Sequence, residues 1–121
     1  MTTPEGLPEL PGIDTALGMK RMMNKVALYE KVLRDFHARF ADEAAQIRTT
    51  WEAGDFTAAE RRAHSTKGLA GTIGATALQD AALALEYALK EGQAPADIYD
   101  RFVQELRTVI DGIAKAFDIP A

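Results

Sequence analysis

Apolar residues recur every three to four positions along most of the chain, and this spacing predicts helices. A short helix is expected from the N-cap Asp14 to Met22. A long second helix follows from Asn24, with a continuous apolar stripe over about seven turns, until the sequence AGD at 53–55 ends it. The stripe consists of Val26, Tyr29, Leu33, Phe36, Phe40, Ala44, Ile47 and Trp51.

Three further helices are expected in the second half of the chain. The third begins at Asp55 or Thr57 and ends at 74, the fourth begins at Thr76, which forms a capping-box match with Gln79, and the last runs from Pro95 to Phe117. The inward positions of the third helix are Phe56, Ala59, Ala63, Thr66, Ala70 and Ile73. Four long helices with short connections predict an all-α fold, an antiparallel up-down four-helix bundle with a short additional N-terminal helix.

The first twelve residues have a different composition from the rest. The sequence MTTPEGLPELPG holds three of the five prolines, so residues 1–12 are expected to form a flexible leader or linker and residues 13–119 the single domain.

Composition and charge exclude several classes of function. The chain of 121 residues has no cysteine, which removes disulfides and thiolate chemistry. A formal charge of −4 argues against nucleic acid as the partner, because phosphate backbones need a basic face. No apolar run approaches the length of a membrane span, so we expect a cytoplasmic domain without membrane insertion.

Candidate chemistry gathers in the sequence HSTKGLAGTIG at 64–74. With the alanines of the third helix pointing inward, one outer face of that helix carries Arg61, His64, Lys67, Gly68 and Gly71. The glycines would let another macromolecule approach the histidine closely, which offsets their cost of about 1 kcal/mol each in a helix. The glycine spacing does not match a nucleotide-binding loop, and no strand precedes it.

A neutral imidazole is a nucleophile through one ring nitrogen when the other is held as a donor. No oxyanion hole or base accompanies His64, and two histidines on different helices do not make a metal site. A histidine that transiently carries a phosphoryl group fits this face best. His37, on the second helix, has no such surroundings and is expected to be a solvated flank residue.

The sequence from AHSTKGLAGTIGATAL to LE at 85–86 resembles the histidine phosphotransfer (HPt) domains of bacterial phosphorelays. Their pattern is H-x-x-K-G, a glycine ten residues after the histidine and a leucine four further on, here His64, Lys67, Gly68, Gly74 and Leu78. The resemblance covers roughly residues 11–117. Thr66 departs from the larger apolar residue more usual there, and its hydroxyl is expected to bond back to the helix.

The resemblance implies a role for each matching residue. His64 would accept the phosphoryl group from a receiver-domain aspartate and pass it to another receiver, with Lys67 beside the phosphoryl oxygens. Gly68 would leave room for the receiver, and Glu86 would accept the other ring N–H of the histidine. Arg61 and Gly71 belong to the same predicted partner-binding face.

The implied protein is a phosphocarrier without an ATP site or a cofactor of its own, with Mg²⁺ expected on the partner. Its partners would be receiver domains of response regulators or of a hybrid sensor kinase, and a monomer is expected. Two alternatives stay open: the phosphoacceptor module of a chemotaxis-type histidine kinase, and an adaptor that binds receivers without phosphotransfer.

Overall fold

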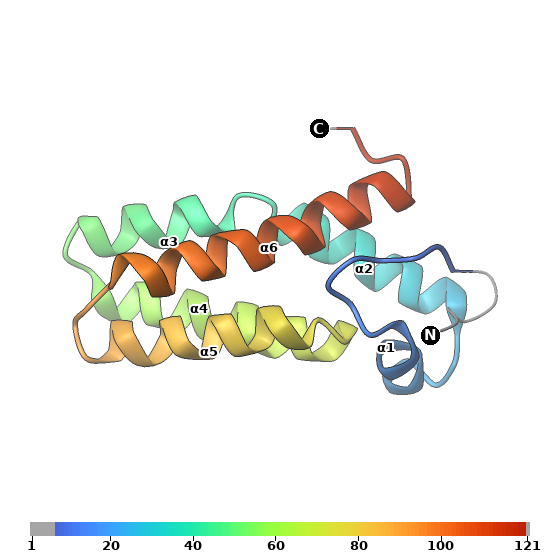
Figure 1. The fold of residues 1–121 in the computed structure, drawn as a ribbon, viewed down its shortest axis with the longest axis horizontal. Coiled ribbons are helices and arrows are strands. Elements are labelled where there is room, and N and C mark those ends of the chain that lie inside the picture. The colour runs from blue at the N-terminus through green and yellow to red at the C-terminus, as the bar shows by residue number, and fades with distance from the viewer. Residues whose placement is uncertain (1–6, 121) are drawn as a thin grey trace.

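The computed structural model describes residues 7–120, and these residues form six helices and no strand (Figure 1). The helices are α1 (Thr15–Arg21), α2 (Val26–Phe40), α3 (Glu43–Glu52), α4 (Phe56–Ile73), α5 (Thr76–Lys90) and α6 (Ala96–Ala116). The all-α prediction is confirmed for this part of the chain.

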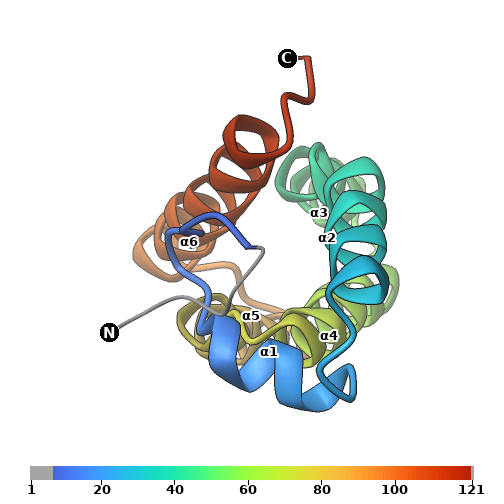
Figure 2. The same cartoon turned by 90° about the vertical axis from the view of Figure 1, so that its right-hand side faces the viewer.

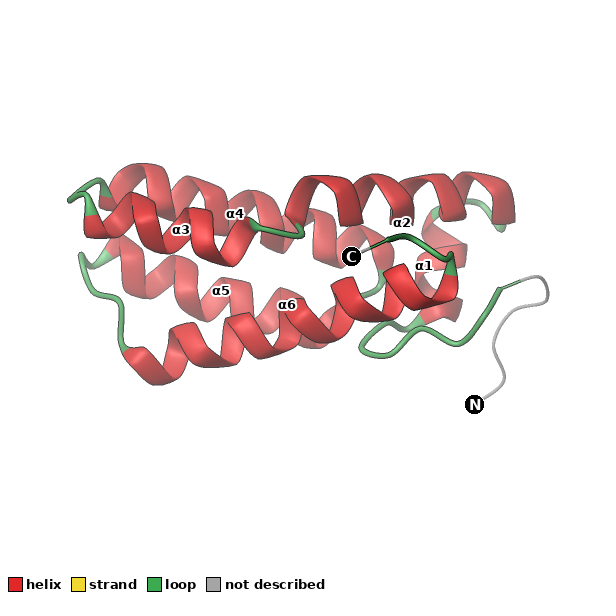
Figure 3. Ribbon diagram, turned by 90° about the horizontal axis from the view of Figure 1, so that it is seen from above, coloured by secondary structure: helices red, strands yellow, loops and turns green. Residues whose placement is uncertain are grey.

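The long helices lie side by side around one apolar core. Helices α2 and α3 follow one another along one side of the molecule, and α4, α5 and α6 run beside them (Figure 3). Seen along the long axis, α5 and α4 neighbour each other, with α6 on one flank and α2 with α3 on the other (Figure 2). The largest fully buried side chains include Tyr29, Phe40, Leu85 and Phe102.

The prediction of one continuous helix from Asn24 to Trp51 was wrong. The chain leaves helical geometry at Asp42, whose backbone has φ −108° and ψ 12°, so α2 and α3 are separate. No glycine or proline marks this break, and the apolar stripe continues across it because Phe40 and Ile47 are both buried. Glu43, the first residue of α3, is buried, and its carboxylate pairs with Arg62 of α4.

The connection between α4 and α5 is tied to α1. Gly74 ends α4 in the left-handed region at φ 87°, and its carbonyl accepts a hydrogen bond from the Asp14 backbone N–H at 2.8 Å. The Tyr29 hydroxyl donates to the Ile73 carbonyl at 2.6 Å and lies directly against Gly18. These bonds fix the C-terminal end of α4 from two sides.

The predicted helix caps at Asp14 and Asp55 are confirmed, and those at Asn24 and Thr76 are wrong. Helix α2 begins after Lys25, without a side-chain cap. The side chains of Asp14 and Asp55 each accept a backbone N–H of the following first turn at 3.0 Å. Thr76 instead lies inside α5, which begins after Ala75 without a side-chain cap, and Gln79 lies over α4.

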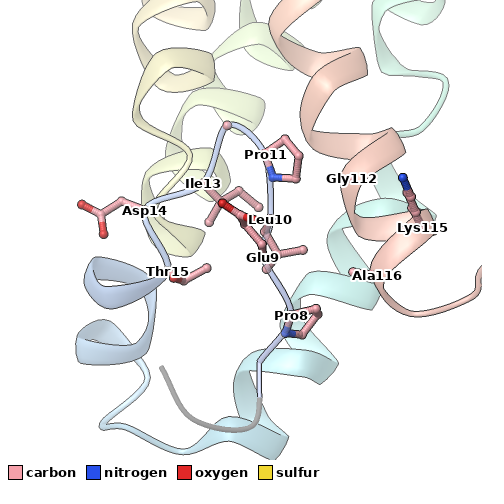
Figure 4. Close-up of a pocket in the computed structure, with 11 residues that line it drawn as sticks. Pro8, Glu9, Leu10, Pro11, Ile13, Asp14, Thr15, Gly112, Lys115 and Ala116 are labelled. Atoms are coloured by element: carbon pink, nitrogen blue, oxygen red, sulfur yellow. The ribbon is translucent and has the colours of Figure 1, made fainter. Parts of the chain in front are cut away.

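The predicted flexible leader of residues 1–12 is corrected in its second half. Leu7 and Leu10 are buried and belong to the hydrophobic core; residues 1–6 lie outside the described part of the chain. The segment crosses beside Gly112 of α6 and leaves an open hollow of about 920 Å³ (Figure 4).

Candidate functional site

The small buried residues of α4 place His64 on the surface. Ala59, Ala63 and Ala70 are fully buried, and each residue of a helix lies about 100° from the one before. His64 therefore emerges at the edge of the buried face, and 62% of its side chain is exposed. Thr66 is also buried, and its hydroxyl donates to the Arg62 carbonyl at 3.0 Å, as expected from the sequence.

Glu86 of α5 connects the two polar residues of the predicted site. Its Oε2 lies 2.9 Å from Nδ1 of His64, and its Oε1 lies 2.8 Å from Nζ of Lys67. The Glu86 side chain is only 15% exposed, and that of Lys67 is 23% exposed. The structure thus brings together His64, Lys67 and Glu86, which are up to 22 positions apart in the sequence.

The contacts of Glu86 fix its charge. Burial alone would raise the pKa of the Glu86 carboxyl, but hydrogen bonds from Lys67 and His64, together with the charge of Lys67, lower it below its ordinary value. An ionised carboxylate only accepts hydrogen bonds, so Nδ1 of His64 is the donor. In the neutral ring Nε2 then carries the free lone pair, and no described residue hydrogen-bonds to it.

Gly68 is open, as the sequence predicts. A Cβ built at this position would meet no atom within 4 Å outside its own helix backbone. Gly68 lies one turn after His64, so bare backbone adjoins the imidazole on the outer side of α4.

Gly71 does not belong to this open surface. It is buried, and a Cβ there would lie 2.5 Å from Nε2 of Gln79, whose side chain covers it from α5. Its carbonyl accepts a hydrogen bond from Arg21 of α1. The structure therefore gives Gly71 a packing role between helices, which overturns its expected place on the partner-binding face.

Arg61 is exposed on the outer side of α4, one turn before His64. His37 of α2 is half-buried and makes no side-chain hydrogen bond or ion pair within residues 7–120.

Sequence reasoning missed the ion pair between α3 and α4. Arg62 donates from Nη1 to both oxygens of Glu43, at 2.9 and 3.1 Å. Burial raises the pKa of the Glu43 carboxyl, although the guanidiniums of Arg62 and Arg39 oppose the shift. The sequence signal for this pair is a charged residue, Glu43, beside the apolar stripe. Its inward position can be recognised only when the helix break at Asp42 is known.

Within residues 7–120, no group of three or more potential metal-ligating side chains comes together. No helix in this range is long and apolar enough to cross a membrane.

The fold and site define a helical domain with one exposed histidine, His64, whose ring is hydrogen-bonded to a carboxylate and lies beside the open position at Gly68. The family model described as Hpt domain matches residues 31–116, and the chain belongs to this family. Hpt domains are phosphocarriers of two-component systems that act through a histidine and interact with receiver domains. No curated protein and no solved structure gives a significant match.

Proposed function

We propose that this chain carries a phosphoryl group on Nε2 of His64 and exchanges it with aspartates of receiver domains. The observation that carries the proposal is the 2.9 Å hydrogen bond between Nδ1 and Glu86, because it leaves the exposed Nε2 as the nucleophile.

The transfer step needs no proton movement. The Nε2 lone pair of His64 forms a bond to phosphorus as the bond from phosphorus to the aspartate oxygen breaks, and the aspartate leaves as a carboxylate. The ring keeps its hydrogen on Nδ1 and becomes positively charged. The ionised Glu86 stabilises that charge through the same hydrogen bond, and the reverse reaction uses the same groups.

Lys67 and Gly68 support the step in different ways. The ammonium of Lys67 neutralises Glu86 in the free protein and lies on the His64 side of α4, where it offsets phosphoryl charge. The open surface at Gly68 admits the active site of the receiver, which brings Mg²⁺ and the reacting aspartate.

In this proposal α2 with α3 forms one member of an antiparallel up-down bundle, with α4, α5 and α6 as the others. The functional unit is the helical domain together with the packed residues 7–12, acting as a monomer in the cytoplasm and without ATP chemistry of its own.

The test is labelling by phosphorylated receiver domains. Wild-type protein is expected to acquire acid-labile, alkali-stable phosphate, and His64→Gln should abolish it. His37→Gln is the matched control, because it removes the other histidine and should leave the label intact. Label that survives the loss of His64 refutes the proposal, and receiver binding without any label would instead identify an adaptor.

A further inference from the structure

A second feature lies on the side of α4 that faces α2 and α3. A hollow of about 410 Å³ there is lined by three arginines from two helices, together with Glu43 and Ser65. Arg39 comes from the last turn of α2, and Arg61 and Arg62 come from α4. In a chain with a formal charge of −4, this is a local concentration of positive charge.

Two of the three guanidiniums form no direct ion pair with the described residues, although the charge of Arg39 acts on the Glu43 carboxylate from a longer distance. Arg62 is bound to Glu43, but within residues 7–120 neither Arg39 nor Arg61 forms an ion pair within 4.0 Å. Arg39 lies over the Phe40 ring, with its guanidinium carbon 5.0 Å from the ring centre. Asp35 and Asp42 also lie on this side of the molecule, but no hydrogen bond joins them to these arginines.

The hollow is close enough to His64 to be covered by the same partner. Ser65 lines it and directly follows His64, and Arg61 lies one turn before the histidine. A protein interface of standard size covers about 800 Å² on each partner, which corresponds to a disc of about 16 Å radius. Neighbouring helix axes are about 8–10 Å apart, so a disc centred on His64 reaches Arg61 and the end of α2.

Covering these arginines is unfavourable unless the partner supplies negative charge. A desolvated guanidinium without a partner costs several kcal/mol, whereas a carboxylate opposite it forms two parallel, charge-assisted hydrogen bonds. We infer that Arg39 and Arg61 form a binding site for carboxylate side chains on the receiver, beside its active site, in which the guanidiniums donate and the carboxylates accept, and that they select receivers with an acidic surface there. This inference rests on the proposed function.

The test compares two double variants that remove the same charge. The first variant, Arg39→Ala with Arg61→Ala, removes two guanidiniums from the hollow and keeps the ion pair of Arg62 with Glu43. The second, Arg101→Ala with Arg107→Ala, removes two exposed arginines of α6. The probe is the receiver domain that labels wild-type His64 fastest among those encoded in the source organism. The measured quantity is kcat/KM of transfer at low and high ionic strength, with thermal unfolding as the folding check.

The first double variant is expected to lower kcat/KM by about tenfold at low ionic strength and to lose most of its salt dependence. The α6 control should match the wild type. Equal behaviour of the two double variants overturns the inference. Direct labelling of the wild-type protein by phosphoramidate separates this failure from a failure of the proposed function. If the proposed function is wrong, phosphoramidate labels His64 but no phosphorylated receiver does. If only this inference is wrong, receivers label His64 and the two double variants behave alike.

Discussion

Replacing Glu86 with alanine tests the chemistry of the site most directly. The substitution removes the acceptor for Nδ1 of His64 and the counterion of Lys67, while the Ala side chain keeps the helical propensity of α5. The imidazole then has no partner that selects its tautomer, so Nε2 is no longer reserved for the phosphoryl group.

The expected magnitude follows from the geometry. A hydrogen bond to a charged group contributes about 1.5–3 kcal/mol, but 62% of the His64 side chain is exposed and water competes for it. The lower end, about 1.5 kcal/mol, is close to the roughly 1.4 kcal/mol that makes a tenfold change, so transfer to and from His64 should slow by about tenfold in Glu86→Ala. In Glu86→Gln the amide oxygen still accepts from Nδ1, but as a neutral group, and a loss of about threefold is expected.

Two measurements check this prediction. Rapid mixing with a phosphorylated receiver gives the transfer rate, and the ¹⁵N shifts of the ring report which nitrogen of His64 carries the hydrogen. The wild type should show the hydrogen on Nδ1, and Glu86→Ala should show a mixture of tautomers. A wild-type transfer rate in Glu86→Ala, or a ring hydrogen on Nε2 in the wild type, refutes the reasoning. Glu91→Ala, an exposed carboxylate just after α5, is the matched control.

Three further predictions concern the glycines and Glu86. Gly68→Ala should raise the free energy of unfolding by about 0.5–1 kcal/mol in urea titration, because helix propensity improves and no atom is displaced, whereas Gly68→Gln should fold and slow transfer from receivers. Gly18→Ala should lower the free energy of unfolding by about 2–3 kcal/mol, since the added Cβ would overlap the Tyr29 hydroxyl and lie 2.6 Å from the Ile73 carbonyl; a neutral effect in the same titration would contradict that packing. Because the folded-state pKa of Glu86 is lowered, its stabilising effect is complete above its ordinary value of 4.5 and is lost as the pH falls through the folded value. The difference in unfolding free energy between wild type and Glu86→Gln should therefore shrink below about pH 4.5, and a difference that stays constant into acid would argue against the ionised carboxylate.

The positions of most helices follow from the apolar spacing, because burial of one face sets the period of each helix. The spacing did not reveal the break at Asp42, since the stripe from Phe40 to Ile47 stays in phase across it. The apolar spacing also does not predict that Leu7 and Leu10 are buried, because two leucines among prolines show no helical or strand period.

The glycines of α4 show what local sequence leaves undetermined. Gly68 and Gly71 were expected on one exposed face, yet only Gly68 is open. Gly71 points about 60° nearer to α5, where Gln79 covers it. The tertiary packing decides on which side of α4 the helix α5 lies. The burial of Gly71 therefore could not be predicted from the residue spacing within α4 alone.

The alanines of α4 and α5 account for the reach of Glu86. Ala59, Ala63 and Ala70 on one helix, and Ala81 and Ala82 on the other, are buried, and small residues at a helix contact bring the axes closer together. A Glu side chain on α5 can then contact two residues of α4 at 2.8 and 2.9 Å. Larger residues in this seam would move α5 outward and separate Glu86 from His64 without touching either side chain. The polar site therefore depends on the apolar packing beneath it, and the same packing leaves the outer face of α4, with His64 and Arg61, free to meet a partner.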